Sequence, residues 1–184
     1  MGPSALAFGP VSSRPDDLCY RQPTPADAPQ VAELAVEGFA TYRAFAPAQW
    51  QVPSHDDALE RSQVALGHPS TWGMLAEEGS RLRGHVVLFA AADSRVPSDD
   101  PALAHLWQLF VAQAWWGSGL AARLMSAAVE AAARHGFERM RLWTPGEHGR
   151  ARRFYEREGW TAAGESVHDP AFGMATIEYH RDLG

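Results

Sequence analysis

Leu109-Phe-Val-Ala-Gln-Ala-Trp-Trp-Gly-Ser-Gly-Leu-Ala121 is the stretch of sequence on which the fold of this chain depends. Its first residues end an apolar strand predicted at residues 104–111. Gly117 and Gly119 then open an alanine-rich segment, residues 117–135, whose apolar side chains recur at helical spacing. A strand that runs through a glycine turn into a helix leaves backbone N–H groups unpaired at the positive end of the helix dipole. The stretch therefore predicts an anion site, usually for a phosphate group.

The composition is typical of a globular protein that folds as one domain. The chain has 184 residues, of which 46% are hydrophobic and 21% charged, and this length is sufficient to bury a substantial core. Residues 1–16 are rich in Pro, Ser, Gly and Ala, so we expect a flexible N-terminal tail there. We expect residues 17–184 to form the single domain.

Charge and cysteine content exclude several classes of partner. The net charge of -6 argues against a nucleic-acid partner, which normally requires a basic face. No apolar run approaches the roughly 18–20 residues that span a bilayer, and the N-terminal residues do not have the pattern of a signal peptide. A single cysteine, Cys19, excludes an internal disulfide and suits a reducing compartment. We expect a cytoplasmic protein that binds neither membrane nor nucleic acid.

The hydrophobic periodicity predicts an α/β (α+β) fold. Strands are expected at residues 18–21, 72–76, 82–91, 104–111, 139–144, 160–167 and 174–180. Helices are expected at residues 27–39, 56–66, 117–135 and 150–158, with a loop or irregular helix at 41–53. The continuously apolar residues 86–89 indicate a central strand that is buried on both faces. This order predicts a central sheet of mixed direction with about seven strands, flanked by about four helices.

The glycine turn alone is compatible with more than one ligand. Residues 117–122 match G-x-G-x-x-A, which is the pattern of a dinucleotide site. That site also requires an acidic residue after the next strand, whereas Glu138 precedes the strand at residues 139–144. The turn lacks the Lys-Ser/Thr of a P-loop, which argues against a nucleoside triphosphate. A third interpretation also remains open, in which the glycines only allow close packing at the start of a helix and bind no ligand.

A second motif follows the first and extends the interpretation. His148-x-x-Ala151-x-x-x-Tyr155-x-x-x-Gly159-Trp160 is similar to Asn-x-x-Ala-x-x-x-Tyr-x-x-x-Gly-aromatic. The first motif is similar to Leu-x-Val, a short spacer, and Arg/Gln-Gly-x-Gly-hydrophobic-Gly/Ala. Together, in this order of strand and helix, the two motifs resemble those of the GCN5-related N-acetyltransferase (GNAT) superfamily. The resemblance runs from about residue 18 to residue 183 and implies a single N-acetyltransferase domain.

The resemblance implies acetyl-CoA as co-substrate, with no metal. Backbone amides of residues 116–121 would hold the pyrophosphate, and the backbone of residues 109–111 would pair with the pantetheine arm. Glycines allow phosphate oxygens to approach the backbone closely, and Ser118 could add its hydroxyl. The implied CoA-binding residues are Leu109, Phe110, Val111, Trp116, Gly117, Ser118, Gly119, Leu120, Ala121 and His148.

Two positions depart from the family pattern. Trp116 stands where the family usually has Arg or Gln, so a side-chain contact to phosphate is lost although the amide contacts survive. His148 stands where the family has Asn, and its imidazole can still donate one hydrogen bond. The basic residues Arg150, Arg152 and Arg153 either assist with the 3′-phosphate or form a solvated helix face. These departures keep a second hypothesis open, that of a catalytically idle member that binds CoA as a sensor or partner module.

The resemblance also implies catalytic roles for two residues. Tyr155 matches the general acid that protonates the departing CoA thiolate. His105 occupies a family position for a base glutamate, and a neutral imidazole can accept a proton from an ammonium group. A structural role for His105 remains an alternative. The other family position for a base is Trp143, which cannot serve.

The acceptor is expected to be a primary amine of a small molecule or an amino-acid-like compound. In this family, the segment that contains Tyr42, Arg43 and Trp50 usually forms one wall of the acceptor site. The two aromatic residues would favour a bulky or cationic amine through cation–π contact, and Arg43 could bind a substrate carboxylate. Dimers are common in the family, so a homodimer is a further expectation.

Overall fold

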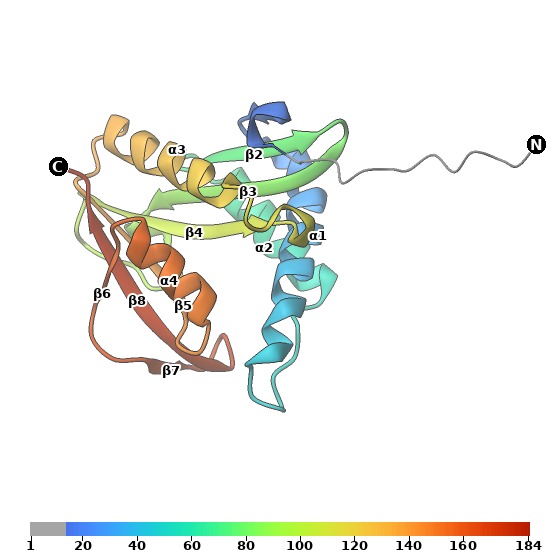
Figure 1. Ribbon diagram of the computed structural model, residues 1–184. Coiled ribbons are helices and arrows are strands. Elements are labelled where there is room, and N and C mark those ends of the chain that lie inside the picture. Colours follow the sequence, from blue (N-terminus) through green and yellow to red (C-terminus); the bar gives the residue numbers. More distant parts are fainter. Residues whose placement is uncertain (1–13) are drawn as a thin grey trace, which may run out of the picture.

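The computed structural model describes residues 14–184, in which an eight-stranded mixed sheet is the central element (Figure 1). The strands are β1 (Cys19–Arg21), β2 (Trp72–Glu78), β3 (Arg81–Ala90), β4 (Leu103–Val111), β5 (Arg139–Pro145), β6 (Thr161–Ala162), β7 (Val167–Asp169) and β8 (Met174–Asp182). Within these residues the α-helices are α1 (Ala28–Ala40), α2 (His55–Gly67), α3 (Leu120–Arg134) and α4 (Gly149–Arg157). The predicted fold class, a mixed sheet flanked by helices, is confirmed.

Short 3-10 helices connect several of these elements. They are η1 (Pro15–Asp17), η2 (Pro25–Asp27), η3 (Thr41–Ala44), η4 (Ala91–Asp93) and η5 (Gln113–Trp115). Of the expected N-terminal tail, residues 1–13 lie outside the described residues. The Tyr20 hydroxyl donates a hydrogen bond of 2.7 Å to the Pro15 carbonyl, so η1 is attached to the sheet. No helix within residues 14–184 has the length and apolar character needed to cross a membrane.

One predicted strand is wrong. The sequence favoured a continuous strand over residues 160–167, but the structure divides this segment into β6 and β7. Gly164 lies between them with a φ of 86°, in the left-handed region that interrupts an extended chain. Both pieces pair with β8, β6 through Thr161 opposite His180 and β7 through Val167 opposite Thr176. The sheet order is β1-β2-β3-β4-β5-β8-β6, with β7 also on β8.

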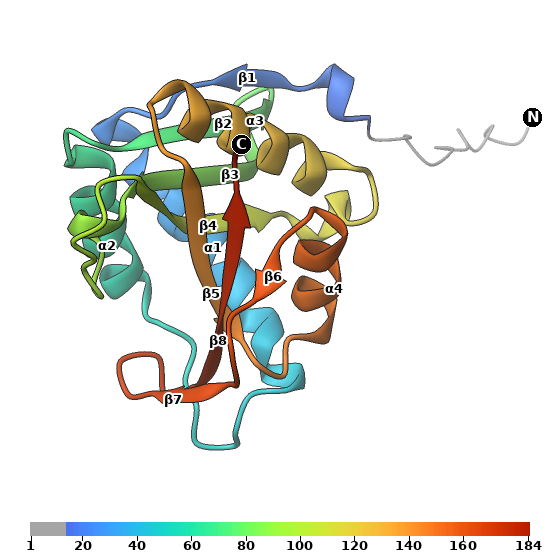
Figure 2. The same ribbon diagram turned by 90° about the vertical axis from the view of Figure 1, so that its left-hand side faces the viewer.

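The helices cover both faces of the sheet. On one face α3 and α4 pack against a core that includes Val86, Leu120 and Leu124. On the other face α1 and α2 enclose a smaller core that contains Val31 and Val87. Neighbouring residues of β3 thus belong to opposite cores, and the expected burial of this strand on both faces is confirmed. Figure 2 shows α1 and α2 behind the sheet and α3 and α4 on its other side.

The sheet separates between β4 and β5. These parallel strands pair only from Leu103 opposite Arg139 to His105 opposite Arg141. Beyond this point β4 has a bulge at Trp107, because Leu88 pairs with Leu106 while Val87 pairs with Gln108. A bulge bends its strand and increases the local twist. Figure 2 shows the result, with β2 to β4 running across the view and β5 and β8 running upright.

A glycine in α1 brings the next segment close to β4. A Cβ atom at Gly38 would lie 2.2 Å from the Phe110 ring, so only glycine allows this close approach of the helix. The chain continues from α1 directly into η3, which contains Tyr42. The loop or irregular helix expected after α1 is confirmed, and its position places Tyr42 beside the second half of β4.

Candidate active site

A cleft of about 1210 Å³ follows the unpaired edge of β4. Its walls are formed by α1, η3 and α2, by β4 and β5, by the glycine turn before α3, by α4, and by residues 169–172. Three of the residues predicted for a site, Ser118, Arg43 and Trp50, do not line it. The predicted residues that do line it are Tyr42, His105, Leu109, Phe110, Val111, Trp116, Gly117, Gly119, Leu120, Ala121, His148 and Tyr155.

The second half of β4 presents backbone groups to the cleft. Ala112 N–H donates to the Arg83 carbonyl of β3 at 2.8 Å. In an antiparallel ladder, residues that face the partner strand alternate with residues that face away. Leu109 and Val111 therefore direct their N–H and C=O groups away from β3, where β5 has already diverged. The indole Nε1 of Trp116 donates to the Val111 carbonyl at 2.9 Å, so the groups left for a ligand are Leu109 N–H, Leu109 C=O and Val111 N–H.

The glycine turn adopts a backbone that only glycine accepts readily. Gly117 has a φ of 81° and Gly119, the residue before α3, has a φ of 91°. No atom lies within 4 Å of where a Cβ would stand at either position, so the requirement is conformational rather than a matter of packing. The turn directs its backbone toward the cleft and starts α3 immediately afterwards.

Only some of the predicted amides are free in this turn. Trp116 N–H donates to the Gln113 carbonyl at 3.1 Å, and Ser118 N–H donates to the Trp115 carbonyl at 3.3 Å. The Ser118 hydroxyl donates to the Trp115 carbonyl and accepts the Leu120 N–H at 3.3 Å, so it serves the turn itself. The amides within the predicted range that make no such internal bond are those of Gly117, Gly119 and Ala121.

Trp116 supports a cation from a different element. The guanidinium Cζ of Arg150, in the first turn of α4, lies 3.6 Å from the centre of the Trp116 ring. Arg150 and Arg153 line the cleft. Arg152 does not, because its guanidinium donates to the Tyr179 hydroxyl at 3.2 Å and to the Gly146 carbonyl at 3.1 Å. The positive charge absent from position 116 is thus restored beside the turn by Arg150.

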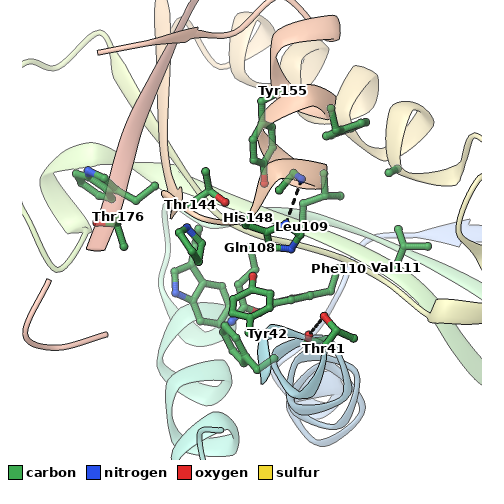
Figure 3. Close-up of a pocket in the computed structure, with 18 of the residues that line it drawn as sticks. Thr41, Tyr42, Gln108, Leu109, Phe110, Val111, Thr144, His148, Tyr155 and Thr176 are labelled. Atoms are coloured by element: carbon green, nitrogen blue, oxygen red, sulfur yellow. Dashed lines mark hydrogen bonds between the residues drawn. The ribbon is translucent and has the colours of Figure 1, made fainter. Parts of the chain in front are cut away.

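Tyr155 projects from α4 into the cleft (Figure 3). Its ring packs against Trp160 and Tyr179, with centroids 6.2 and 5.8 Å away, and only 9% of the residue is exposed. Figure 3 shows the hydroxyl directed toward the space between Thr144, His148 and Leu109. Burial, and to a smaller extent Tyr179, raise the pKa of Tyr155 above its ordinary value. The hydroxyl therefore remains protonated at neutral pH and can donate.

His148 is held in one tautomer. It is the N-cap of α4, and its Nδ1 accepts the Ala151 N–H at 3.2 Å. The proton of the neutral ring consequently sits on Nε2, which is free to donate a hydrogen bond. Burial lowers the pKa of His148 and keeps the ring neutral. Its ring also contacts Tyr42 and Phe45, with centroids 5.0 and 4.8 Å away, and so connects α4 to the opposite wall.

A family model, described as the Acetyltransferase (GNAT) family, matches residues 36–160, which include both motifs of the cleft. This chain belongs to the GNAT acetyltransferase family. No significant match was found among curated proteins.

Solved structures with the fold of this GNAT protein come from several organisms. An acetyltransferase from Thermus thermophilus is 21% identical, with a TM-score of 0.65 over 90% of this chain and 96% of that one. PaiA N-acetyltransferase from Thermoplasma acidophilum, in complex with coenzyme A, is 16% identical, with a TM-score of 0.64 over 88% and 97%. The yncA protein from Salmonella typhimurium, with its cofactor acetyl-CoA, is 15% identical, with a TM-score of 0.68 over 91% and 94%. At these identities the likeness shows the shared fold.

In this GNAT protein His105 lies at the inner end of the cleft. It is 7% exposed and packs between Phe89 and Trp143, with centroids 5.5 and 4.8 Å away. Burial, together with the positive charge of Arg141, lowers the pKa of His105 to about 3. Its Nδ1 is buried without a hydrogen-bond partner among residues 14–184. An imidazole with this pKa is a weak proton acceptor.

The aromatic wall of the GNAT cleft differs in part from the predicted one. Tyr42 lines it and is fixed by four neighbouring rings, with centroids 5.1 to 6.3 Å away, those of Phe39, Phe45, Trp50 and Phe172. Trp50 stands behind this wall, where its Nε1 donates to the Phe172 carbonyl at 2.9 Å. Arg43 is exposed and does not line the cleft. Phe39 and Phe172 line the cleft but were not predicted, because one was assigned to a helix core and the other to a turn.

Proposed function

We propose that this GNAT acetyltransferase transfers an acetyl group from acetyl-CoA to a primary amine, with Tyr155 as the general acid. One observation carries the proposal: the Tyr155 hydroxyl, the outward-facing edge of β4 and the glycine turn all face one cleft (Figure 3). The structures of PaiA with coenzyme A and of yncA with acetyl-CoA, which share the fold, support the choice of co-substrate. Acetyl-CoA would supply the acyl group as an activated thioester.

The residues present suit each part of CoA. The amides of Gly117, Gly119 and Ala121 at the start of α3 would bind the pyrophosphate, since unpaired N–H groups at a helix N-terminus attract anions. Arg150 adds a positive charge beside them. Leu109 C=O and Val111 N–H would pair with the pantetheine amides in the manner of an added strand, which leaves Leu109 N–H for the reacting end of the ligand. The His148 Nε2–H is a further donor at the opposite wall.

Catalysis would then depend on how the two substrates are positioned and on two hydrogen-bond donors of the protein. The N–H of Leu109 is placed to stabilise negative charge on the carbonyl oxygen of the reacting acyl group. The Tyr155 hydroxyl donates its proton to the departing thiolate. The proton that the attacking nitrogen loses as the amide bond forms returns, through solvent, to Tyr155 and restores its hydroxyl. Tyr42 and its neighbouring rings would confine the amine against the β4 edge. Because the amine is then held in a fixed orientation next to the thioester, less entropy is lost in reaching the transition state.

Acetyl-CoA is expected to raise the thermal stability of the purified protein. At a concentration about 100 times Kd, a ligand adds about 2.7 kcal/mol, which corresponds to a rise in Tm of about 5–10 °C for a chain of this size. Differential scanning fluorimetry with acetyl-CoA, CoA and NADH separates the alternatives. A shift with NADH and none with acetyl-CoA would contradict the proposal and restore the dinucleotide interpretation of the glycine turn.

A His105→Asn variant is expected to retain most of its activity. The lowered pKa of His105 leaves the ring neutral throughout the neutral range, so the pH dependence of kcat/KM should follow the ionisation of the amine alone. Activity should rise with pH as the amine loses its proton, with the same profile in wild type and variant. A loss of about a hundredfold in kcat, with unchanged affinity for acetyl-CoA, would instead assign His105 as the base.

A further inference from the structure

A buried histidine next to the cleft has no role in the mechanism above. His85, on β3, is fully buried. Its Nε2 lies 3.1 Å from Oε1 of Gln108, and its Nδ1 is buried with no hydrogen-bond partner among residues 14–184. Gln108 directly follows the bulge residue Trp107 on β4 and lines the cleft. Neither His85 nor Gln108 was predicted as a site residue, because no local pattern connects positions 23 residues apart.

The environment of His85 fixes which end of the Gln108 amide faces the cleft. A neutral imidazole carries one N–H, and a buried N–H without a partner is rarer in proteins than an unpaired acceptor. The single hydrogen bond of His85 must therefore satisfy its N–H, which places the proton on Nε2 and requires an oxygen opposite. That oxygen is Oε1 of Gln108, and the bare lone pair remains on Nδ1. Burial, which lowers the pKa of His85 to about 4, keeps the ring in this neutral form.

The NH₂ group of Gln108 is consequently the end available to a ligand. No group in the described part of the chain accepts its two N–H donors, and it is not among the buried side-chain atoms without a partner. Gln108 precedes Leu109, whose N–H faces the reacting carbonyl group. Both residues line the cleft, so a substrate group that binds Gln108 would lie in the same part of the cleft as the reacting carbonyl group.

We propose that Gln108 selects acceptors with a neutral carbonyl oxygen next to the amine, that is, α-amino carbonyl compounds such as α-amino amides. This inference rests on the proposed N-acetyltransferase function and specifies its substrate class. Gln108 offers uncharged donors within an aromatic wall, and a carboxylate there would be buried without a cation of its own. Two of the arginines that line the cleft already have partners, Arg95 with Asp169 and Arg150 with the Trp116 ring.

Three acceptors that differ in one group test this selection. L-phenylalaninamide, L-phenylalanine and phenethylamine share the ring and the amine but carry an amide, a carboxylate or hydrogen on the α-carbon. A leucine-based triplet repeats the comparison with a smaller side chain. The quantity measured is kcat/KM for the amide relative to the simple amine, at one pH. Differences in amine basicity cancel when this ratio is compared between wild type and variants.

Two variants change what Gln108 presents. Gln108→Glu keeps an oxygen for the His85 N–H but places a second oxygen toward the cleft, where it repels a carbonyl oxygen. Gln108→Met keeps the length of the side chain and removes both donors. We expect the amide-to-amine ratio to fall about tenfold or more in both, as for the loss of one hydrogen bond in a desolvated site. Gln63→Glu, the same substitution at an exposed position of α2, should leave the ratio unchanged.

The tautomer of His85 gives a readout independent of activity. Long-range ¹H–¹⁵N spectra of the wild-type protein should show a neutral ring protonated on Nε2. A proton on Nδ1 would mean that the Gln108 oxygen faces the cleft, and would overturn the selection proposed here. Acetylation of the amines with an unchanged ratio in both Gln108 variants would also overturn it, while leaving the N-acetyltransferase function intact. Failure of a broad amine panel with the wild-type protein would contradict the function itself.

Discussion

Tyr155→Phe is expected to lower kcat by about 10²- to 10³-fold while the affinity for acetyl-CoA stays nearly unchanged. The substitution removes one oxygen and keeps the ring that packs on Trp160 and Tyr179. The departing thiolate then loses its proton donor, but the groups that bind CoA, on β4 and at the start of α3, remain. Steady-state kinetics for turnover and isothermal titration calorimetry for acetyl-CoA separate the two effects.

The pH dependence of Tyr155 has a definite direction. Burial raises the pKa of its hydroxyl above the ordinary value of about 10, so the protonated, active form persists to higher pH than for an exposed tyrosine. The wild-type rate should therefore rise as the amine deprotonates and remain high at about pH 9–10. A decline with an apparent pKa of about 10 would show that the pKa of the hydroxyl is not raised.

Tyr20→Phe is the matched control for this substitution. It removes a hydroxyl whose hydrogen bond goes to the Pro15 carbonyl, outside the cleft, and kcat should not change. If Tyr155→Phe kept more than half of the wild-type turnover, the assignment of Tyr155 as general acid would be abandoned. A wild-type protein that binds acetyl-CoA but acetylates no amine would instead support the idle sensor.

Elements defined by local signals were predictable from the sequence. Ser54 marks the start of α2 and its hydroxyl accepts the Asp57 N–H, as a capping residue does. Gly136, with a φ of 84°, follows the end of α3 as expected. The bend at Gly164 was not predictable, because one glycine in an otherwise extended pattern does not reveal whether the chain turns there. The division into β6 and β7 follows from its left-handed backbone.

The candidate site was predictable only where its residues share a motif. The family and its site were inferred from two motifs, at positions 109–121 and 148–160. Most residues of these motifs line one cleft. Contacts between distant segments were not predictable. The Trp50 indole binds the Phe172 carbonyl across 122 positions of sequence, and Arg150 reaches Trp116 from the other motif. Position 116 therefore departs from the family pattern, but the guanidinium of Arg150 supplies a positive charge beside it.

Gly119→Ala is expected to weaken acetyl-CoA binding by about 10- to 100-fold. A residue with a Cβ in the left-handed region is strained by about 1–2 kcal/mol, and the φ of 91° at Gly119 lies in the range that L-residues rarely adopt. The strain is relieved by rotation of the backbone, which turns the N–H groups at the start of α3 away from the pyrophosphate. Each lost hydrogen bond to a charged group costs about 1.5–3 kcal/mol. Titration calorimetry with acetyl-CoA measures the change.

The geometry of the turn allows this effect to be separated from a general loss of stability. No atom lies within 4 Å of a Cβ at Gly119, so the alanine methyl group itself blocks nothing in the free protein. Gly164→Ala introduces the same strain at a φ of 86°, in the bend between β6 and β7, outside the cleft. Both variants should lower Tm, but only Gly119→Ala should weaken binding. Equal acetyl-CoA affinity in the two variants would show that the amides of the glycine turn do not hold the pyrophosphate.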